Sequence, residues 1–225
     1  MPLITNKLMS EESQLLDSKT EKWMEFNNKL QYRYNRQIPE PFKPVMTLVT
    51  KYLKQPSIIL DIGCETGKNA ACLIRHGHKV ILLDIASNAI FYTKENLARE
   101  CLDHGIVDDL NIKIEDLPSE YGPFDAVVGT YAFSFIPPDQ FEETMINNIL
   151  SRIRNNGYFV GSFFGSQHAW ANKPNLTILN SEKLQSLFSS VGFSIVEIQE
   201  EVKEIMTVSG EMTKFHTMDV IAQRL

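Results

Sequence analysis

A glycine-bearing stretch, "IILDIGCETGKN", has the residue types and spacing of a ligand-binding loop. An apolar run ends on Asp61 and is followed by Gly63 and Gly67, which suits a buried strand that enters a tight turn and then a helix. In an open α/β sheet, ligands bind outside the carboxyl ends of the strands, where such a loop would lie. Because the middle position holds Glu65 instead of glycine, the glycine pattern alone does not identify the class of ligand.

Two common phosphate-binding loops do not fit this stretch. A dinucleotide fingerprint, G-x-G-x-x-G, counted from Gly63 would need glycines at Glu65 and Lys68. A P-loop needs four residues before Gly-Lys-Ser/Thr, whereas Gly63 and Gly67 enclose only three and Asn69 replaces the hydroxyl residue. A glutamate inside the loop would also repel a phosphate.

Strand-like and helix-like segments alternate from Ser57 onward, which predicts a doubly wound, mostly parallel α/β sheet with helices on both faces. The last two strands have no helix between them and therefore predict an antiparallel C-terminal hairpin. We expect seven strands in all. The expected strands are 57–62, 79–84, 110–116, 124–136, 157–165, 193–202 and 214–225, and the expected helices are 68–75, 87–103, 139–153 and 181–191.

Residues 1–56 precede this alternation and are expected to form a helical segment or lid, with residues 57–225 as the ligand-binding domain. The segment 13–34 predicts an imperfectly amphipathic helix, and 45–53 a second one after three prolines. The aromatic residues Trp23, Tyr32 and Tyr34 of the first helix suggest either a lid over the ligand or, more plainly, packing of this helix against the sheet.

Composition narrows the class of protein. The chain has 225 residues, 43% hydrophobic and 22% charged, with a formal net charge of −6, which disfavours a nucleic-acid or membrane-surface binder. Its three cysteines have no framework spacing, and no segment has the apolar length of a signal peptide or a membrane span. We expect a soluble cytoplasmic protein of unknown oligomeric state.

Five landmarks in chain order resemble the class I S-adenosylmethionine (SAM)-dependent methyltransferases, whose first motif is D/E-x-G-x-G-x-G. Asp61, Gly63 and Gly67 match that motif, and Asp84 ends the second strand where the family binds both ribose hydroxyls. The other landmarks are "IEDLP", "FDAVVGTYAFSFI" and "IRNNGYFVGSFF". The resemblance implies a Rossmann-like fold and a SAM cofactor. Its implied cofactor-binding residues are Asp61, Gly63, Cys64, Glu65, Gly67, Asp84, Ile85, Glu115, Asp116, Leu117 and Thr130.

The C-terminal half is similar to the tellurite-resistance (TehB-like) small-molecule branch. It carries F-G-x-x-x-x-W-A around His168 and Trp170 and a closing H-x-x-x-V-I-A strand, with His168 in place of an aspartate. The resemblance implies methyl transfer to a small-molecule acceptor, and the absence of an N/D-P-P-Y tetrapeptide argues against the amino-methylating DNA and glutamine enzymes. Tyr131, His168 and Trp170 are the substrate-side candidates. His168, His216 and Glu204 are candidate bases, none of which the reaction requires.

Glu65 leaves an alternative open. Pointed at the ammonium of the cofactor or at solvent it would be harmless, but pointed at the cofactor carboxylate it would repel it, and the chain would then be a catalytically degenerate SAM-binding or SAM-fold interaction module. Asp116 and Glu115 compete for the adenine amine. His76 and His78 flank Gly77 without a third ligand at suitable spacing, so we expect no metal site.

Overall fold

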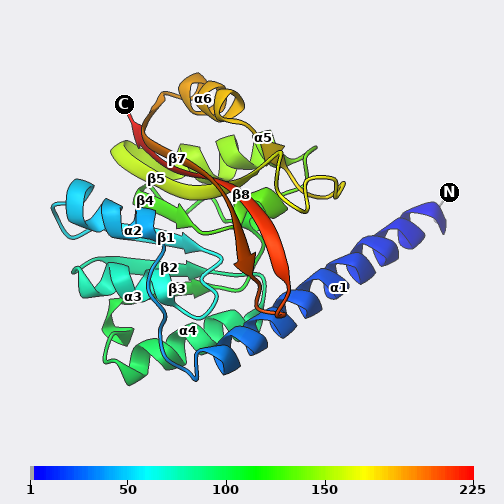
Figure 1. Ribbon diagram of the computed structural model, residues 1–225, viewed down its shortest axis with the longest axis horizontal. Helices are drawn as coiled ribbons and strands as arrows, with labels where there is room; N and C mark the ends of the chain where they lie inside the picture. The colour runs from blue at the N-terminus through cyan, green and yellow to red at the C-terminus, as the bar shows by residue number, and fades with distance from the viewer. Residues whose placement is uncertain (1–2) are drawn as a thin grey trace.

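The computed structural model describes residues 3–225, with side chains described from Ser18 onward. Its sheet follows the order β3-β2-β1-β4-β5-β8-β7, which reverses direction between β1 and β4 (Figure 1). The strands β1 to β5 pair in parallel, while β8 is antiparallel to both β5 and β7. The expected doubly wound sheet with an antiparallel C-terminal hairpin is therefore confirmed. The strands are β1 (Ile58–Ile62), β2 (Lys79–Leu83), β3 (Ile106–Leu110), β4 (Phe124–Gly129), β5 (Ile153–Gly165), β6 (Ile178–Leu179), β7 (Phe193–Met206) and β8 (Met212–Arg224).

An apolar core lies on each face of the sheet, because β1, β2 and β4 are apolar on both sides. One face packs against α2 (Lys43–Thr47) with its π-helical continuation Leu48–Tyr52, and against α3 (Lys68–Arg75) and α4 (Ser87–Arg99). The other face packs against α5 (Phe141–Thr144), the π-helical turn Met145–Ile149 and α6 (Ser181–Ser190). Short 3-10 turns cover Asp103–Gly105, Ile114–Asp116, Phe133–Phe135 and Leu150–Arg152.

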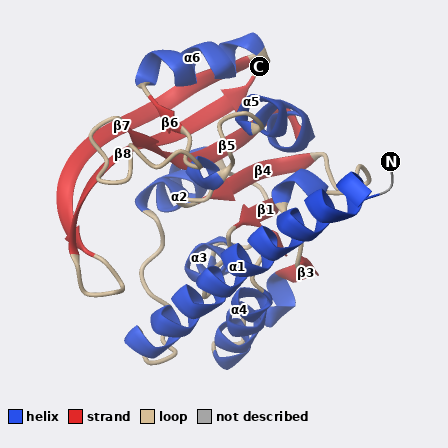
Figure 2. Ribbon diagram, turned by 90° about the vertical axis from the view of Figure 1, so that its right-hand side faces the viewer, coloured by secondary structure: helices blue, strands red, loops and turns tan. Residues whose placement is uncertain are grey.

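Helix α1 (Leu3–Arg33) lies beside α4, and its N-terminal end extends away from the sheet (Figures 1 and 2). The side chain of Asn88 on α4 donates to the Met24 carbonyl over 2.7 Å and to Asn28 over 2.9 Å. Gln31 and Asn96 exchange two buried amide hydrogen bonds of 3.1 and 3.0 Å. These contacts fix α1 on the same side of the molecule as the loop after β1.

Two expected strands were misplaced, and one further strand was not expected. The third strand is Ile106–Leu110 rather than 110–116, because the alternating apolar residues after Leu110 belong to a turn that packs them on the core. The fourth ends at Gly129 because Tyr131 takes a left-handed φ of +54°. The two-residue β6, paired with β5, adds an eighth strand.

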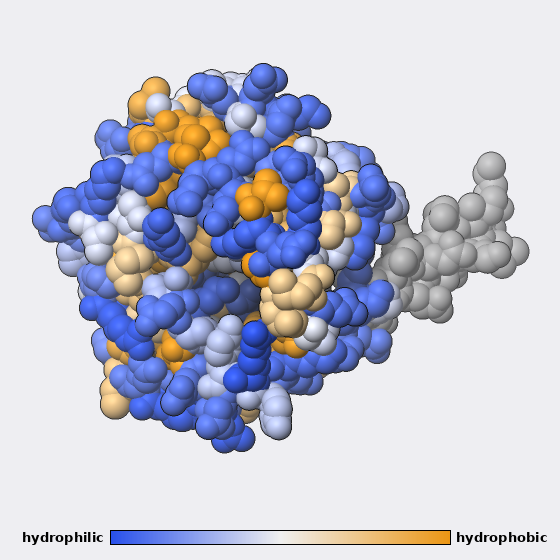
Figure 3. All heavy atoms as spheres, viewed as in Figure 1, coloured by the Kyte–Doolittle hydropathy of each residue, from blue (hydrophilic) through white to orange (hydrophobic). Residues whose placement is uncertain are grey.

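No helix within residues 3–225 combines the length and the apolar character needed to cross a bilayer. On the face shown in Figure 3 most of the surface is hydrophilic, and apolar side chains form small separate groups.

Candidate functional site

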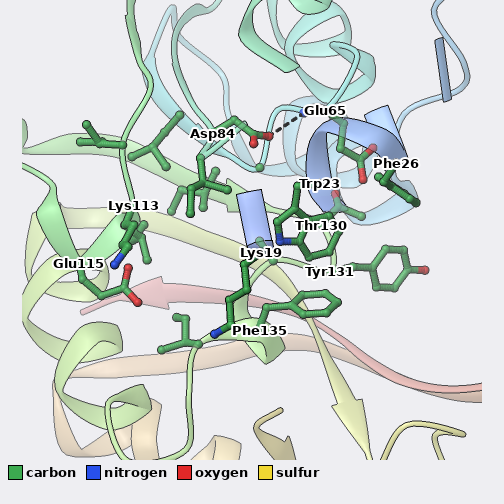
Figure 4. Close-up of a pocket in the computed structure, with 18 of the residues that line it drawn as sticks. Lys19, Trp23, Phe26, Glu65, Asp84, Lys113, Glu115, Thr130, Tyr131 and Phe135 are labelled. Atoms are coloured by element: carbon green, nitrogen blue, oxygen red, sulfur yellow. Dashed lines mark hydrogen bonds between the residues drawn. The ribbon is translucent and has the colours of Figure 1, made fainter. Parts of the chain in front are cut away.

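A cavity of about 490 Å³ opens at the carboxyl ends of β1, β2 and β4, on the side where the strand order reverses. Its walls come from the loop after β1, the ends of β2 and β4, the turn at Ile114 and helix α1 (Figure 4). Parallel strands with a reversal in their order place ligands at this position. The cavity is therefore the candidate site.

The loop after β1 has three left-handed residues that turn the chain back toward α3. Gly63 has φ +69°, Glu65 φ +53° and Gly67 φ +95°. A Cβ on Gly67 would meet the methyl group of Thr93 at 3.1 Å, so glycine fits there for both conformation and space. Glu65 accepts a left-handed conformation that is unusual for a side chain other than Gly, Asn or Asp. The glutamate therefore does not change the path of the loop.

Asp84 directly follows β2 and is hydrogen-bonded to this loop. Its Oδ2 accepts a hydrogen bond from the Glu65 N–H over 3.3 Å, and its Oδ1 accepts one from the Ala86 N–H over 2.9 Å (Figure 4). Burial raises the pKa of the Asp84 carboxyl to about 6, although both N–H groups favour the anion. Asp84 lines the cavity, so a carboxylate with free lone pairs faces that space.

The Glu65 side chain also lines the cavity and is largely buried. Its carboxylate forms an ion pair of 2.9 Å with Lys68, at the start of α3. In Figure 4 it points toward Phe26 of α1. The charge of Glu65 is thus balanced within the loop itself, while its remaining lone pairs face the cavity.

Asp61 lies behind the loop, fully buried, and neither carboxylate oxygen has a hydrogen-bond partner among the described residues. Burial, reinforced by the neighbouring Glu65, raises the pKa of Asp61 to about 7, with Lys68 acting in the opposite direction. Asp61 does not line the cavity. A carboxylate in this position can act on the loop rather than directly on a ligand in the cavity.

Helix α1 supplies the wall that faces the loop. Trp23 packs edge-on against Phe135 with ring centroids 4.7 Å apart, and against Phe26 at 5.7 Å. Asn27, two per cent exposed, lines the cavity with an amide oxygen that has no partner among the described residues. Asn96 links this wall to the loop, because its amide nitrogen donates to Gln31 and to the Thr66 carbonyl. Neither Asn27 nor Asn96 belongs to a sequence motif, so neither was among the expected site residues.

The structure separates the sequence-predicted residues into three groups. Lining the cavity are Gly63, Glu65, Asp84, Ile85, Glu115, Thr130 and Tyr131. Asp61, Cys64, Gly67 and Leu117 are placed behind it, within or beside the loops that form it. Asp116 is exposed and does not line it, whereas its neighbour Glu115 does.

His168 and Trp170 lie outside the cavity, which corrects the expectation of a substrate-facing rim. The His168 ring is buried between Phe164 and Phe215, with centroids 3.9 and 4.6 Å away. Its Nδ1 accepts a hydrogen bond from the Trp170 N–H over 3.0 Å. Burial, followed by the nearby His216 and Lys173, lowers the pKa of His168 to about 4, so the ring is a neutral packing residue at pH 7.

The other proposed bases are also removed from the cavity. His216 pairs with Glu200 over 2.7 Å, and neither His216 nor Glu204 lines the cavity. Tyr131 does line it, but burial, followed by the charge of Asp219, raises its pKa to about 12, so it stays protonated at pH 7. Within the described residues, no three His, Cys, Asp or Glu side chains form a group that could hold a metal ion.

The hydrogen-bonding groups of the cavity fit SAM. The Asp84 carboxylate, the Glu65 carboxylate and the unpartnered Asn27 oxygen all accept hydrogen bonds, and all three face one space. SAM carries ribose hydroxyls and an ammonium group as donors, and the apolar side chains Leu83, Ile85 and Ile114 line the same cavity. A phosphate bound at the loop would instead lie near the carboxylates of Glu65 and Asp84, which agrees with rejection of the phosphate loops.

Comparison with known proteins gives a consistent result. A family model described as a methyltransferase domain matches residues 59–157. An uncharacterized methyltransferase from Anoxybacillus flavithermus (strain DSM 21510 / WK1) is 27% identical over 141 residues, which are 62% of this chain and 63% of that relative. The chain thus aligns with less than two thirds of this curated relative.

Two solved structures share the fold. TehB from Haemophilus influenzae superposes with a TM-score of 0.70 at 19% identity, covering 88% of this chain and 67% of TehB. The 1,6-didemethyltoxoflavin-N1-methyltransferase of Burkholderia thailandensis, solved with 1,6-didemethyltoxoflavin and S-adenosylhomocysteine, gives 0.60 at 18% identity, covering 81% and 77%.

Proposed function

We propose that this chain, which belongs to the class I SAM-dependent methyltransferase family, transfers a methyl group from SAM to a small-molecule acceptor. The observation that carries the proposal is the union of the glycine loop and Asp84 on one cavity, through the hydrogen bond from Glu65 to Asp84. The glycine loop and the acid lie next to each other because they follow the carboxyl ends of neighbouring parallel strands, where α/β sheets bind ligands.

In this proposal Asp84 accepts hydrogen bonds from the ribose hydroxyls, and Glu65 with Asn27 accepts them from the ammonium group. Ile85, Ile114 and Glu115 line the part of the cavity that would hold the adenine. Gly67 permits the left-handed turn of the loop, in front of the buried Asp61, and Asn69 fixes the end of β4 through a 2.7 Å hydrogen bond to Thr130. Asp116 is no longer assigned the adenine contact, because it is exposed outside the cavity.

When bound, SAM supplies an electrophilic methyl group on a sulfonium. The protein's contribution is then to orient the acceptor and exclude water, which in favourable cases supplies roughly 7 to 11 kcal/mol of the barrier. Trp23, Phe26 and Phe135 provide the apolar wall for this purpose. We include in the proposal that residues 1–56 act as a lid over residues 57–225, and that the three free thiols suit a reducing cytoplasm.

Calorimetric titration with SAM and with S-adenosylhomocysteine tests the proposal. We expect micromolar binding of both ligands, and at least a 30-fold loss for Asp84→Ala, because hydrogen bonds to a charged group contribute about 1.5–3 kcal/mol each. Asp116→Ala is the matched control and should leave both affinities unchanged. Absence of binding to the unaltered chain would overturn the proposal and favour an interaction module that retains only the fold.

A further inference from the structure

The cavity has a second half that the proposed cofactor contacts do not use. It is formed by α1 and by the segment after β4, and Trp23, Phe26, Tyr131 and Phe135 give it an aromatic lining. These rings are half-buried, so their faces still present apolar area. A planar apolar molecule would recover that area by stacking or edge contact. The aromatic lining of this half therefore suits the ring system of a planar apolar molecule.

Two charged side chains lie beside these rings, and only one of them lacks an ion-pair partner among the described residues. Glu65 points toward Phe26 and is paired with Lys68, whereas Lys19 extends from α1 and is exposed at the opening (Figure 4). The other charged lining residues, Asp84, Lys113 and Glu115, belong to the other half. No ion pair joins Lys19 to any side chain from Ser18 onward. Apart from Lys19 and the paired Glu65, the polar side chains on this side are neutral, and they include Thr130 and Gln140.

We propose that the acceptor is a planar, largely apolar small molecule with a carboxylate or similar oxyanion, which Lys19 binds at the mouth of the cavity. This rests on the proposed function, because it assigns the acceptor half of the same site. A lysine ammonium on a flexible stem binds an oxyanion as a point charge, while the aromatic wall holds the ring beneath it. Lys19 thus determines acceptor specificity without taking part in the bond changes.

The position of Lys19 is set by the same contacts that hold α1. Asn88 holds the Met24 carbonyl of the turn that follows Lys19, and Trp23, one helical turn from Lys19, is packed on Phe135. The backbone of Lys19 is therefore held beside the opening of the cavity, which its side chain lines. Lys22, three residues further on, is exposed and does not line the cavity, so it provides a matched control on the same helix.

The test uses 2-naphthoate and its neutral analogue 2-naphthamide, each titrated calorimetrically into the protein saturated with S-adenosylhomocysteine. We expect naphthoate to bind at least tenfold more tightly than the amide. Lys19→Met should reduce naphthoate to the affinity of the amide and leave the amide unchanged, Lys19→Arg should keep most of the preference, and Lys22→Met should change neither.

Equal affinity for the two probes, or an equal loss of both in Lys19→Met, would overturn this assignment. The titration with S-adenosylhomocysteine that precedes each experiment separates the two proposals. If the unaltered chain does not bind S-adenosylhomocysteine, the proposed function fails. If it binds that ligand but shows no preference for naphthoate, only the role of Lys19 fails.

Discussion

The backbone N–H of Glu65 donates to Oδ2 of Asp84 over 3.3 Å, so the residue that departs from the glycine motif is bonded to the acid that directly follows β2. The bond uses the backbone of Glu65, which any residue could supply in the same conformation. The Glu65 side chain takes no part in this bond and forms an ion pair with Lys68. Glutamate at this position therefore adds a carboxylate to the loop and keeps the backbone hydrogen bond to Asp84.

Glu65→Gln should weaken S-adenosylhomocysteine binding by about tenfold or more, because it removes a charged acceptor for the ammonium group. The same change should leave binding of 5′-methylthioadenosine, which lacks the amino-acid part, unaltered. Calorimetry with both ligands measures the difference, with the exposed Glu25→Gln as control. Tighter binding of S-adenosylhomocysteine by Glu65→Gly or Glu65→Gln would instead show that the carboxylate obstructs the site.

Asp61→Asn should stabilise the protein at alkaline pH. Burial raises the Asp61 pKa from 3.8 to about 7, so the folded state retains its proton where the unfolded chain has lost it. Stability from this group is complete below pH 3.8 and is lost as the pH rises toward 7. Since each pKa unit corresponds to about 1.4 kcal/mol, removing the charge should return several kcal/mol at pH 8 and little at pH 4.

Urea unfolding of Asp61→Asn and the unaltered chain at both pH values measures this gain. Asp103→Asn removes an exposed carboxylate and should give no pH-dependent difference. A gain of the same size at pH 4 and pH 8 would assign the effect to packing rather than to the buried charge.

Asn96→Ala should reduce both stability and cofactor affinity. It removes the donor to the Thr66 carbonyl and leaves the buried Gln31 amide without its partner, at a cost of about 2–4 kcal/mol. Urea unfolding and titration with S-adenosylhomocysteine measure the two effects. The exposed Asn147→Ala should shift stability by less than about 0.5 kcal/mol. Full affinity in a destabilised Asn96→Ala protein would show that α1 and the loop are independent.

His168→Gln should leave S-adenosylhomocysteine affinity unchanged, because His168 is outside the cavity. It should also lessen acid sensitivity. The His168 pKa falls from 6.5 to about 4 in the folded protein, so its contribution is present above pH 6.5 and is lost as the pH falls toward 4. The variant should lose about 2–3 kcal/mol less than the unaltered chain across that range. Thermal unfolding of both proteins at several pH values from 7 to 4 measures this difference in stability. An equal loss of stability in the two proteins would refute the prediction.

The order of strands and helices was predictable because buried parallel strands are continuous apolar runs, and Asp61 and Asp84 sit where such runs stop. The third strand was misplaced because apolar alternation at Leu110, Ile112 and Ile114 also suits a turn whose side chains pack on the core. Local pattern cannot separate the two, since both bury every second residue.

The composition of the cavity wall was less predictable. Residue type suggested His168 as a substrate contact, but three aromatic rings bury it, and only the folded chain brings them together. Asn96 forms hydrogen bonds with Gln31 and Thr66, and no sequence pattern indicates either bond. Glu115 rather than Asp116 faces the cavity because the 3-10 turn, not a strand, sets which of the two points inward.

The pairing of Trp23 with Phe135 has a consequence for synthesis of the chain. At about 5–20 residues per second, Trp23 is added roughly 6–22 seconds before Phe135. Until then one wall of the cavity has no opposing ring, even if α1 has already formed. The site is therefore completed late, and a nascent chain that stops short of Phe135 lacks the hydrophobic contact that closes it.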